Sequence, residues 1–179
     1  MKPYDNVPVL AWMWLHGRCR ACRVAISPRY PLVEFGTGAL FAAVVLTRTS
    51  AVGIALGVLA VLVLVPVALI DLDYHLIPNR ITGPAAILAI VLGTALDPSG
   101  EPARLIAGAA AGGFFLLAAF ASPRGMGMGD VKLAGVMGLL LGDAVAPALL
   151  IALVVGILGG LVALSAGHAI IAAYLHLVG

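Results

Sequence analysis

Residues 51–70 read AVGIALGVLAVLVLVPVALI, a run of twenty residues without a charged side chain, and Asp71 follows it directly. About twenty apolar residues in a helix are long enough to cross the hydrocarbon core of a bilayer. The stretch therefore predicts a transmembrane helix. Its length argues against a membrane β-barrel, whose strands are about half as long and alternate between apolar and polar residues.

The composition of the whole chain agrees with a membrane protein. Of its 179 residues, 63% are hydrophobic and only 10% are charged, whereas a soluble domain is about half apolar and a quarter charged. We expect an all-α, polytopic transmembrane helix bundle of about six spans, with residues 168–179 as a short further helix or an interfacial one. The other predicted spans are 32–47, 83–96, 104–121, 131–142 and 146–166.

The basic residues predict the orientation, because Lys and Arg next to short loops are retained on the cytoplasmic side. Five of them precede the first span, among polar and aromatic residues that do not form a signal peptide. We expect residues 1–31 to form a basic cytoplasmic arm and residues 32–179 the transmembrane domain. Segments 71–82 and 122–130 then lie inside, and 97–103 lies outside. The five basic residues are Lys2, Arg18, Arg20, Arg23 and Arg29.

Acidic residues are scarce in this chain. A charge at the bilayer centre costs at least about 2.5 kcal/mol, so an acidic residue near a membrane span indicates a structural or catalytic role. Asp71 and Asp73 follow the second span, and Asp130 follows Gly127-Met128-Gly129. Pro78 should break the chain after the second span and leave Asp71 at its cytoplasmic end. Asp130 should open the fifth helix. The glycines also suit a plain flexible connector and Asp130 a plain helix cap.

Two carboxylates that meet at one surface share a proton and titrate as a pair. Such a pair supplies the general base and the general acid of an aspartic protease. Asp71 and Asp130 lie at the same predicted membrane face. This chemistry needs no metal and no cofactor.

Two motifs then resemble those of a known family. Asp71 followed by Ile77-Pro78-Asn79, and the later segment Gly127-Met128-Gly129-Asp130-Val131-Lys132-Leu133, are similar to the paired motifs of the type IV prepilin peptidases, the bacterial branch of the GxGD aspartic peptidases. Segments 5–10, 17–22 and 26–34 resemble the end of the cytoplasmic domain of full-length members. The resemblance spans residues 5–165.

The resemblance implies that Asp71 and Asp130 are the catalytic pair, and that Asp73 contributes local charge or hydrogen bonding. It implies removal of the basic leader of pilin-like precursors at the cytoplasmic face of the bacterial inner membrane, with precursor and lipid as partners and no nucleic acid. The supporting motif residues, which position substrate or shape the site, are Pro78, Asn79, Gly127, Gly129 and Lys132. Asn79 also suits a solvated loop, and Lys132 a topology anchor or a contact to lipid phosphate.

Cys19 and Cys22 form a single CxxC in a basic segment. A structural zinc site usually has four ligands, so the pair is either two reduced thiols in a hairpin or half of a zinc knuckle completed by His16, a second chain or further sequence. Full-length members carry another CxxC and a membrane helix before the segment that matches residues 5–10. We therefore expect neither a complete zinc site nor methylation with S-adenosylmethionine from this chain.

Two other function classes were weighed. A small ion or proton transporter also uses carboxylates in the membrane, but it favours acids within spans, and the middle of every predicted span lacks Asp and Glu. A non-catalytic scaffold that binds pilin subunits would share the fold. Such a scaffold has no need of the acid pair, yet both aspartates are present.

Overall fold

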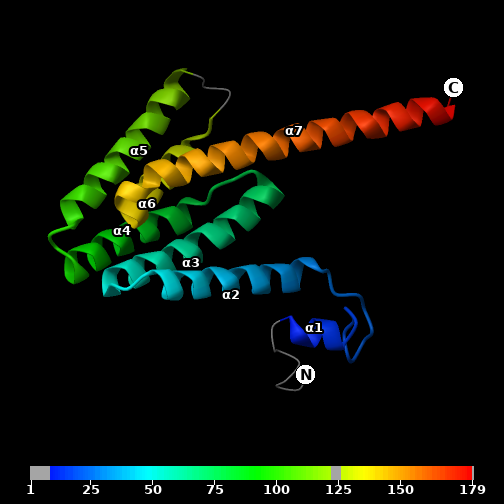
Figure 1. Cartoon of the computed structure of the whole chain (residues 1–179), viewed down its shortest axis with the longest axis horizontal. Helices are drawn as coiled ribbons and strands as arrows, with labels where there is room; N and C mark the ends of the chain where they lie inside the picture. Colours follow the sequence, from blue (N-terminus) through cyan, green and yellow to red (C-terminus); the bar gives the residue numbers. More distant parts are fainter. Residues whose placement is uncertain (1–8, 122–125, 179) are drawn as a thin grey trace.

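The computed structural model describes residues 9–121 and 126–178, and these residues fold into helices, as predicted (Figure 1). Five segments are long and apolar enough to cross a membrane: α2, α3, α4, α5 and the stretch Met128–Val162, which joins α6 to the first half of α7. The elements are α1 (Leu10–Trp14), α2 (Arg29–Thr47), α3 (Ala51–Tyr74), α4 (Asn79–Leu96), α5 (Glu101–Ala121), α6 (Met128–Leu141), the 3₁₀ turn η2 (Gly142–Ala144) and α7 (Val145–Val178).

The predicted fifth and sixth spans are separate helices, but α6 is short. It has 14 residues, a length of about 21 Å, which is less than the thickness of a bilayer core. Residues from 168 onward do not form a separate short helix, because α7 continues without a break to Val178. No proline follows Pro147 in the sequence, so nothing in this stretch interrupts the backbone hydrogen bonds of the helix.

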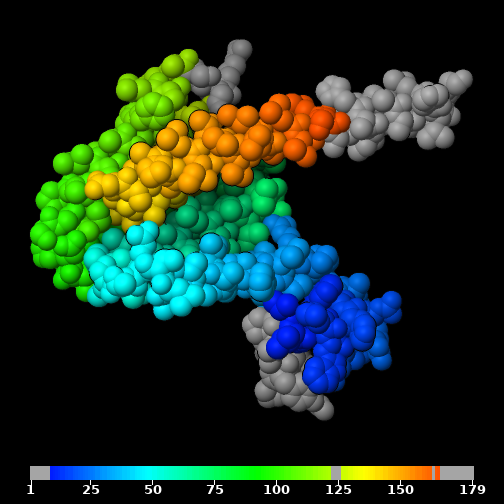
Figure 2. All heavy atoms as spheres, in the orientation of Figure 1, coloured from blue at the N-terminus to red at the C-terminus, as the bar shows by residue number. Residues whose placement is uncertain are grey.

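Helix α6 lies at the centre of the bundle and contacts α3, α4 and α5. Helix α2 packs on the outer side of α3, and α7 extends away from the bundle (Figures 1 and 2). The main core joins three helices. Its buried residues are Leu56, Leu59, Ala60, Val63 and Val67 of α3, Ala85 and Ala89 of α4, and Val136 and Leu140 of α6.

Glycines let α5 and α6 approach each other closely. A Cβ atom on Gly138 of α6 would lie 2.5 Å from the carbonyl oxygen of Ala107 and from the Cα atom of Gly108. The Gly-rich segment 107–113 of α5 thus packs closely on α6. The second Gly-rich segment, 156–160, is different, since a Cβ on any of its glycines would meet no atom within 4 Å.

Arg104 organises the end of the bundle that holds the α4–α5 turn. Its guanidinium donates to Oδ2 of Asp97 at 2.9 Å and to Oε2 of Glu101 at 3.0 Å. It also donates to the carbonyl oxygens of Gly93 and Asp97 at the end of α4, and the Gly93 carbonyl accepts from the amide of Asp97 as well. The hydrogen bond from Arg104 is the main reason why the pKa of the Asp97 carboxyl lies below its usual range.

The CxxC lies in a small hairpin of the N-terminal arm, which projects from the bundle (Figures 1 and 2). Arg18 and Ala25 form an antiparallel bridge, and the amide of Cys19 donates to the carbonyl of Val24 at 2.9 Å. The two cysteines thus lie in a hairpin, as the interpretation of them as two reduced thiols predicted. Across the described part of the chain, no group of three or more His, Cys, Asp and Glu side chains is arranged to hold a metal ion. His16 therefore does not complete a zinc site with Cys19 and Cys22.

The indole of Trp12 holds the same hairpin together. Its Nε1 donates to the carbonyl oxygen of Ile26 at 3.0 Å, and its ring lies against Gly17. Gly17 has a φ of +68°, and an added Cβ would lie 3.0 Å from that ring. Trp14, in contrast, is 82% exposed.

Candidate active site

Asp71 lies in the last turn of α3. The helix continues to Tyr74 and ends at His75, whose φ is +54° and whose amide donates to the carbonyl of Asp71 at 2.8 Å. Pro78 then precedes the first residue of α4 in an extended conformation. The break predicted from Pro78 is present, and it leaves the carboxylate of Asp71 exposed at the end of the helix.

Asp130 lies in the first turn of α6, as predicted. Its Oδ2 accepts a hydrogen bond from the amide of Gly127 at 3.1 Å. This bond satisfies one of the amides that a helix start leaves unpaired, and the positive end of the helix dipole favours the carboxylate. Asp130 therefore caps the helix through Oδ2, as the helix-cap interpretation predicted. This hydrogen bond does not use Oδ1.

The two motifs contact each other at Gly129 and Ile77. A Cβ on Gly129 would lie only 2.9 Å from the Cβ of Ile77. The glycine thus allows the start of α6 to pass close to the segment between α3 and α4. Gly129 is therefore needed for this contact between the two motifs, and the alternate glycines are more than a flexible connector.

Asp71 and Asp130 line one cavity of about 320 Å³. We call the end of the bundle that holds this cavity the acid-pair end. Both carboxylates are exposed, so water reaches them. Of the seven residues predicted for the site, all except Pro78 line the cavity, and Pro78 lies between two that do. The cavity is lined by Asp71, His75, Leu76, Ile77, Asn79, Gly127, Met128, Gly129, Asp130 and Lys132.

Lys132 and Asn79 connect the two motifs a second time. The Nζ atom of Lys132 donates to Oδ1 of Asn79 at 2.9 Å. One residue comes from α6 and the other from the start of α4. The contact favours a local structural role for both residues. It argues against a solvated loop at Asn79 and against a lipid contact for Lys132.

Asp73 has a different partner. Its two carboxylate oxygens accept from Nη1 and Nη2 of Arg29, at 2.7 and 2.9 Å. Arg29 begins α2, so this two-bond ion pair ties the start of α2 to the end of α3. Asp73 does not line the cavity, in agreement with its predicted local role.

Among the polar side chains that line the cavity, His75 is the one that is not in the predicted site. It follows the end of α3 in a left-handed backbone conformation. Its position four residues after Asp71 was the available signal. Since a helix brings such positions to one side, a helix ending at His75 puts both residues on the same face.

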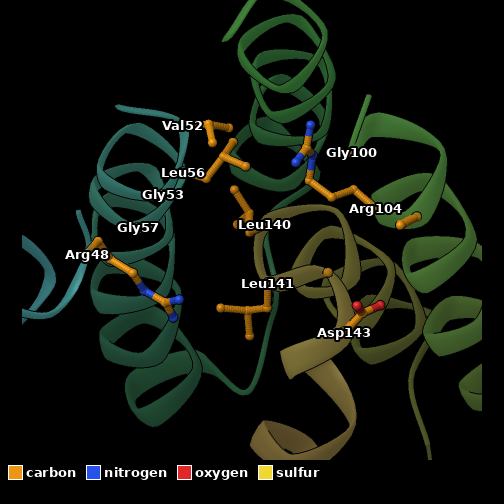
Figure 3. A pocket seen from close by; sticks show the side chains of 12 residues that line it. Arg48, Val52, Gly53, Leu56, Gly57, Gly100, Arg104, Leu140, Leu141 and Asp143 are labelled. Atoms are coloured by element: carbon orange, nitrogen blue, oxygen red, sulfur yellow. The ribbon is translucent and has the colours of Figure 1, made fainter. Parts of the chain in front are cut away.

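A second cavity, of about 280 Å³, lies at the opposite end of the bundle (Figure 3). Arg48, Arg104 and Asp143 are its charged residues. With a single carboxylate and two guanidinium groups, this cavity lacks the paired acids that general acid and base catalysis requires. The acid-pair end is therefore the better candidate for an active site.

Comparison with known proteins shows which family the chain resembles. The chain is 39% identical to the prepilin leader peptidase/N-methyltransferase of Aeromonas salmonicida over 167 residues, 88% of this chain and 56% of the relative. It is 38% identical to the protein of the same name from Burkholderia pseudomallei over 175 residues, 91% of this chain and 55% of the relative. The chain thus spans about half the length of the curated relatives it matches. No solved structure matches it significantly.

Two family models match the chain. Residues 1–48 match the bacterial peptidase A24 N-terminal domain, and residues 58–164 match the type IV leader peptidase family. The second match includes the helices that carry Asp71 and Asp130 and the core that holds them together. This chain belongs to the type IV leader peptidase family.

Proposed function

We propose that the chain is an aspartic endopeptidase that removes the basic leader of pilin-like precursors at the cytoplasmic face of a bacterial inner membrane. The observation that carries the proposal is that Asp71 and Asp130, from helices far apart in the sequence, line one water-accessible cavity. The names of the relatives, which include a prepilin leader peptidase, support the choice of substrate.

The proposed reaction uses the two carboxylates as a pair that shares one proton. The ionised member takes a proton from a water molecule, whose oxygen attacks the carbonyl carbon of the scissile peptide bond. The protonated member donates a hydrogen bond to the carbonyl oxygen, and its proton then goes to the leaving nitrogen. One water is added across the C–N bond, and the pair ends with one proton, as it began.

The position of the site at a helix end suits this chemistry. Water and irregular backbone are tolerated there, whereas the hydrocarbon centre of a bilayer admits neither. The basic residues support a cytoplasmic location, since Arg29, Arg80 and Lys132 lie at the acid-pair end and the basic arm adjoins it. We propose the arm, residues 1–31, as a cytoplasmic segment and residues 32–179 as the peptidase domain.

The proposal is limited to peptide cleavage. The relatives are also named as N-methyltransferases, but the residues gathered at the acid-pair cavity are those of the cleavage reaction. The donors on the described part of the arm do not fit a zinc site, because Cys19 and Cys22 have no third ligand among them. No step of the proposed reaction involves zinc or S-adenosylmethionine.

The test is co-expression of the chain with a type IV prepilin, with loss of the leader followed by gel shift and mass spectrometry. Asp71→Asn and Asp130→Asn keep the side-chain shape and remove the titratable acid, so each should lower the cleavage rate by about a thousandfold or more. Asp73→Asn is the matched control two residues away. It should keep most of the activity, because Asp73 pairs with Arg29 outside the cavity.

The assignment is wrong if either Asn variant cleaves at the wild-type rate while Asp73→Asn does not. A wild-type chain that co-purifies with the prepilin and leaves it uncut would instead support the non-catalytic scaffold. The same spectra show whether the new N-terminus is methylated.

A further inference from the structure

A second, larger hollow adjoins the acid-pair cavity. It has a volume of about 560 Å³ and is bounded by α4, α5 and α6. We call it the α4–α6 groove. It shares Asn79 and Lys132 with the acid-pair cavity, so the two hollows adjoin at that hydrogen-bonded pair. The groove is lined by Asn79, Thr82, Gly83, Ala86, Ile90, Leu105, Gly108, Ala109, Lys132, Gly135, Val136 and Leu139.

The lining is apolar beyond its mouth. Apart from Asn79 and Lys132, the only polar side chain is Thr82, which is 3% exposed and whose hydroxyl lies 3.5 Å from the carbonyl of Pro78. Such a surface has no group left to bind a polar ligand. It matches a hydrocarbon surface instead.

The groove has the dimensions of a helix contact. Its α4 residues run from Asn79 to Ile90, and eleven residues of helix span about 16 Å, which is half of the hydrocarbon core. Five lining residues are glycine or alanine. Small residues let another helix backbone come close, which is the usual basis of helix association in membranes. The five are Gly83, Ala86, Gly108, Ala109 and Gly135.

We propose that the α4–α6 groove seats the apolar segment of the precursor that follows the scissile bond. This inference rests on the proposed function and names the surface that holds its substrate. The shared residues Asn79 and Lys132 argue for it: a chain that leaves the groove past this pair reaches the cavity lined by Asp71 and Asp130. The groove thereby fixes which peptide bond reaches the acids, through about three turns of helix contact.

Gly83 allows a direct test. It lines the groove, and a Cβ added there would meet no atom within 4 Å. Gly83→Leu therefore places a side chain in the groove, and its Cβ meets no other helix. Because Pro84 follows and disfavours helical backbone at a residue with a Cβ, thermal unfolding is measured beside cleavage. Gly113 of α5 has the same open surroundings and does not line the groove, so Gly113→Leu is the matched control.

We expect Gly83→Leu to lower the rate of prepilin cleavage about tenfold or more, the effect of a misfit of one large side chain at a packed surface. Gly113→Leu should cleave at the wild-type rate. Thermal unfolding in detergent should be the same for both variants and the wild type. Equal cleavage by all three proteins would overturn the proposal while leaving the roles of Asp71 and Asp130 intact.

Photo-crosslinking tests the groove independently of catalysis. A photoreactive phenylalanine replaces Ile90, which lines the groove, or Val91, the next residue, which does not. Both side chains are partly exposed, at 38% and 55%. In an Asp71→Asn background the tagged prepilin stays uncut. We expect a prepilin adduct from position 90 and much less from position 91.

The mass of the adduct identifies the occupant. An adduct only with lipid, or only with a second copy of this chain, overturns the proposal, as does equal capture of prepilin at both positions. If the wild type fails to cut the prepilin but position 90 captures it selectively, the groove stands and the peptidase function fails.

Discussion

Asp71 and Asp73 are two positions apart on α3, yet they have different partners. Successive residues of a helix are rotated by about 100°, so positions i and i+2 point to nearly opposite sides. Asp73 points to α2 and pairs with Arg29, while Asp71 lines the cavity. The resemblance to the family's motifs implies the choice of Asp71 over Asp73. The ion pair that explains Asp73 could not be predicted in this way, because Arg29 lies 44 residues away in the sequence.

The hydrogen bond between Lys132 and Asn79 gives a prediction at this scale. Lys132→Met removes the donor and Asn79→Leu removes the acceptor of a 2.9 Å contact. Because the contact joins the two motifs beside the acids, each variant should loosen their alignment and lower prepilin cleavage about tenfold. Thermal unfolding should change little, because both residues are exposed.

The double variant distinguishes a shared role from two separate ones. If the pair acts together, Lys132→Met with Asn79→Leu costs no more than either single change. Additive losses would mean that each residue acts alone, and wild-type rates for both single variants would show that the contact is incidental.

At the scale of helices, the packing of α5 on α6 depends on Gly138. The sequence shows glycines on both helices but not which of them face each other, since that depends on how each helix is rotated in the bundle. Segments 107–113 and 156–160 looked alike in sequence, and only the first meets a neighbouring helix within the described structure. Composition permits close packing, and the tertiary arrangement decides where it occurs.

Gly138→Ala should destabilise the bundle. Alanine is a better helix former than glycine by about 1 kcal/mol, but its Cβ would lie 2.5 Å from the backbone of α5, and backbone atoms cannot move aside as a side chain can. Overpacking costs about 1–3 kcal/mol, so the net effect should be a lower midpoint of thermal unfolding in detergent. Gly113→Ala, in open space, is the control and should be neutral or slightly stabilising. A midpoint for Gly138→Ala equal to that of Gly113→Ala would show that α5 and α6 are not so close.

At the scale of the whole molecule, the charges divide between its two ends. The two basic residues at the end away from the acids are Arg48 and Arg104, and Arg104 is paired there with Asp97 and Glu101. Of the remaining eight Lys and Arg, seven lie in the arm or in the segments predicted to be cytoplasmic, and Lys132 lies near the start of α6 beside the acid-pair cavity. The asymmetry predicts an arm inside the cell and the α4–α5 turn outside it.

Thiol labelling of intact spheroplasts tests this orientation. A membrane-impermeant maleimide should label Cys22, which is exposed in the arm, only after the membrane is permeabilised. Ser99→Cys, in a chain with Cys19→Ser and Cys22→Ser, should be labelled from outside without permeabilisation. Labelling of Cys22 in intact spheroplasts would reverse the topology and place the acid pair on the outer face.

The sequence by itself determined the membrane class, the places where most helices begin and end, and the two aspartates to be tested, because hydropathy, proline and charge act locally along the chain. The tertiary structure decided what those residues have as neighbours. It put Asp71 and Asp130 on one cavity, paired Asp73 with Arg29 and Lys132 with Asn79, and opened the α4–α6 groove next to the acids. These relations depend on the rotation and separation of packed helices, which are fixed by contacts such as that of Gly129 with Ile77 between residues distant in sequence.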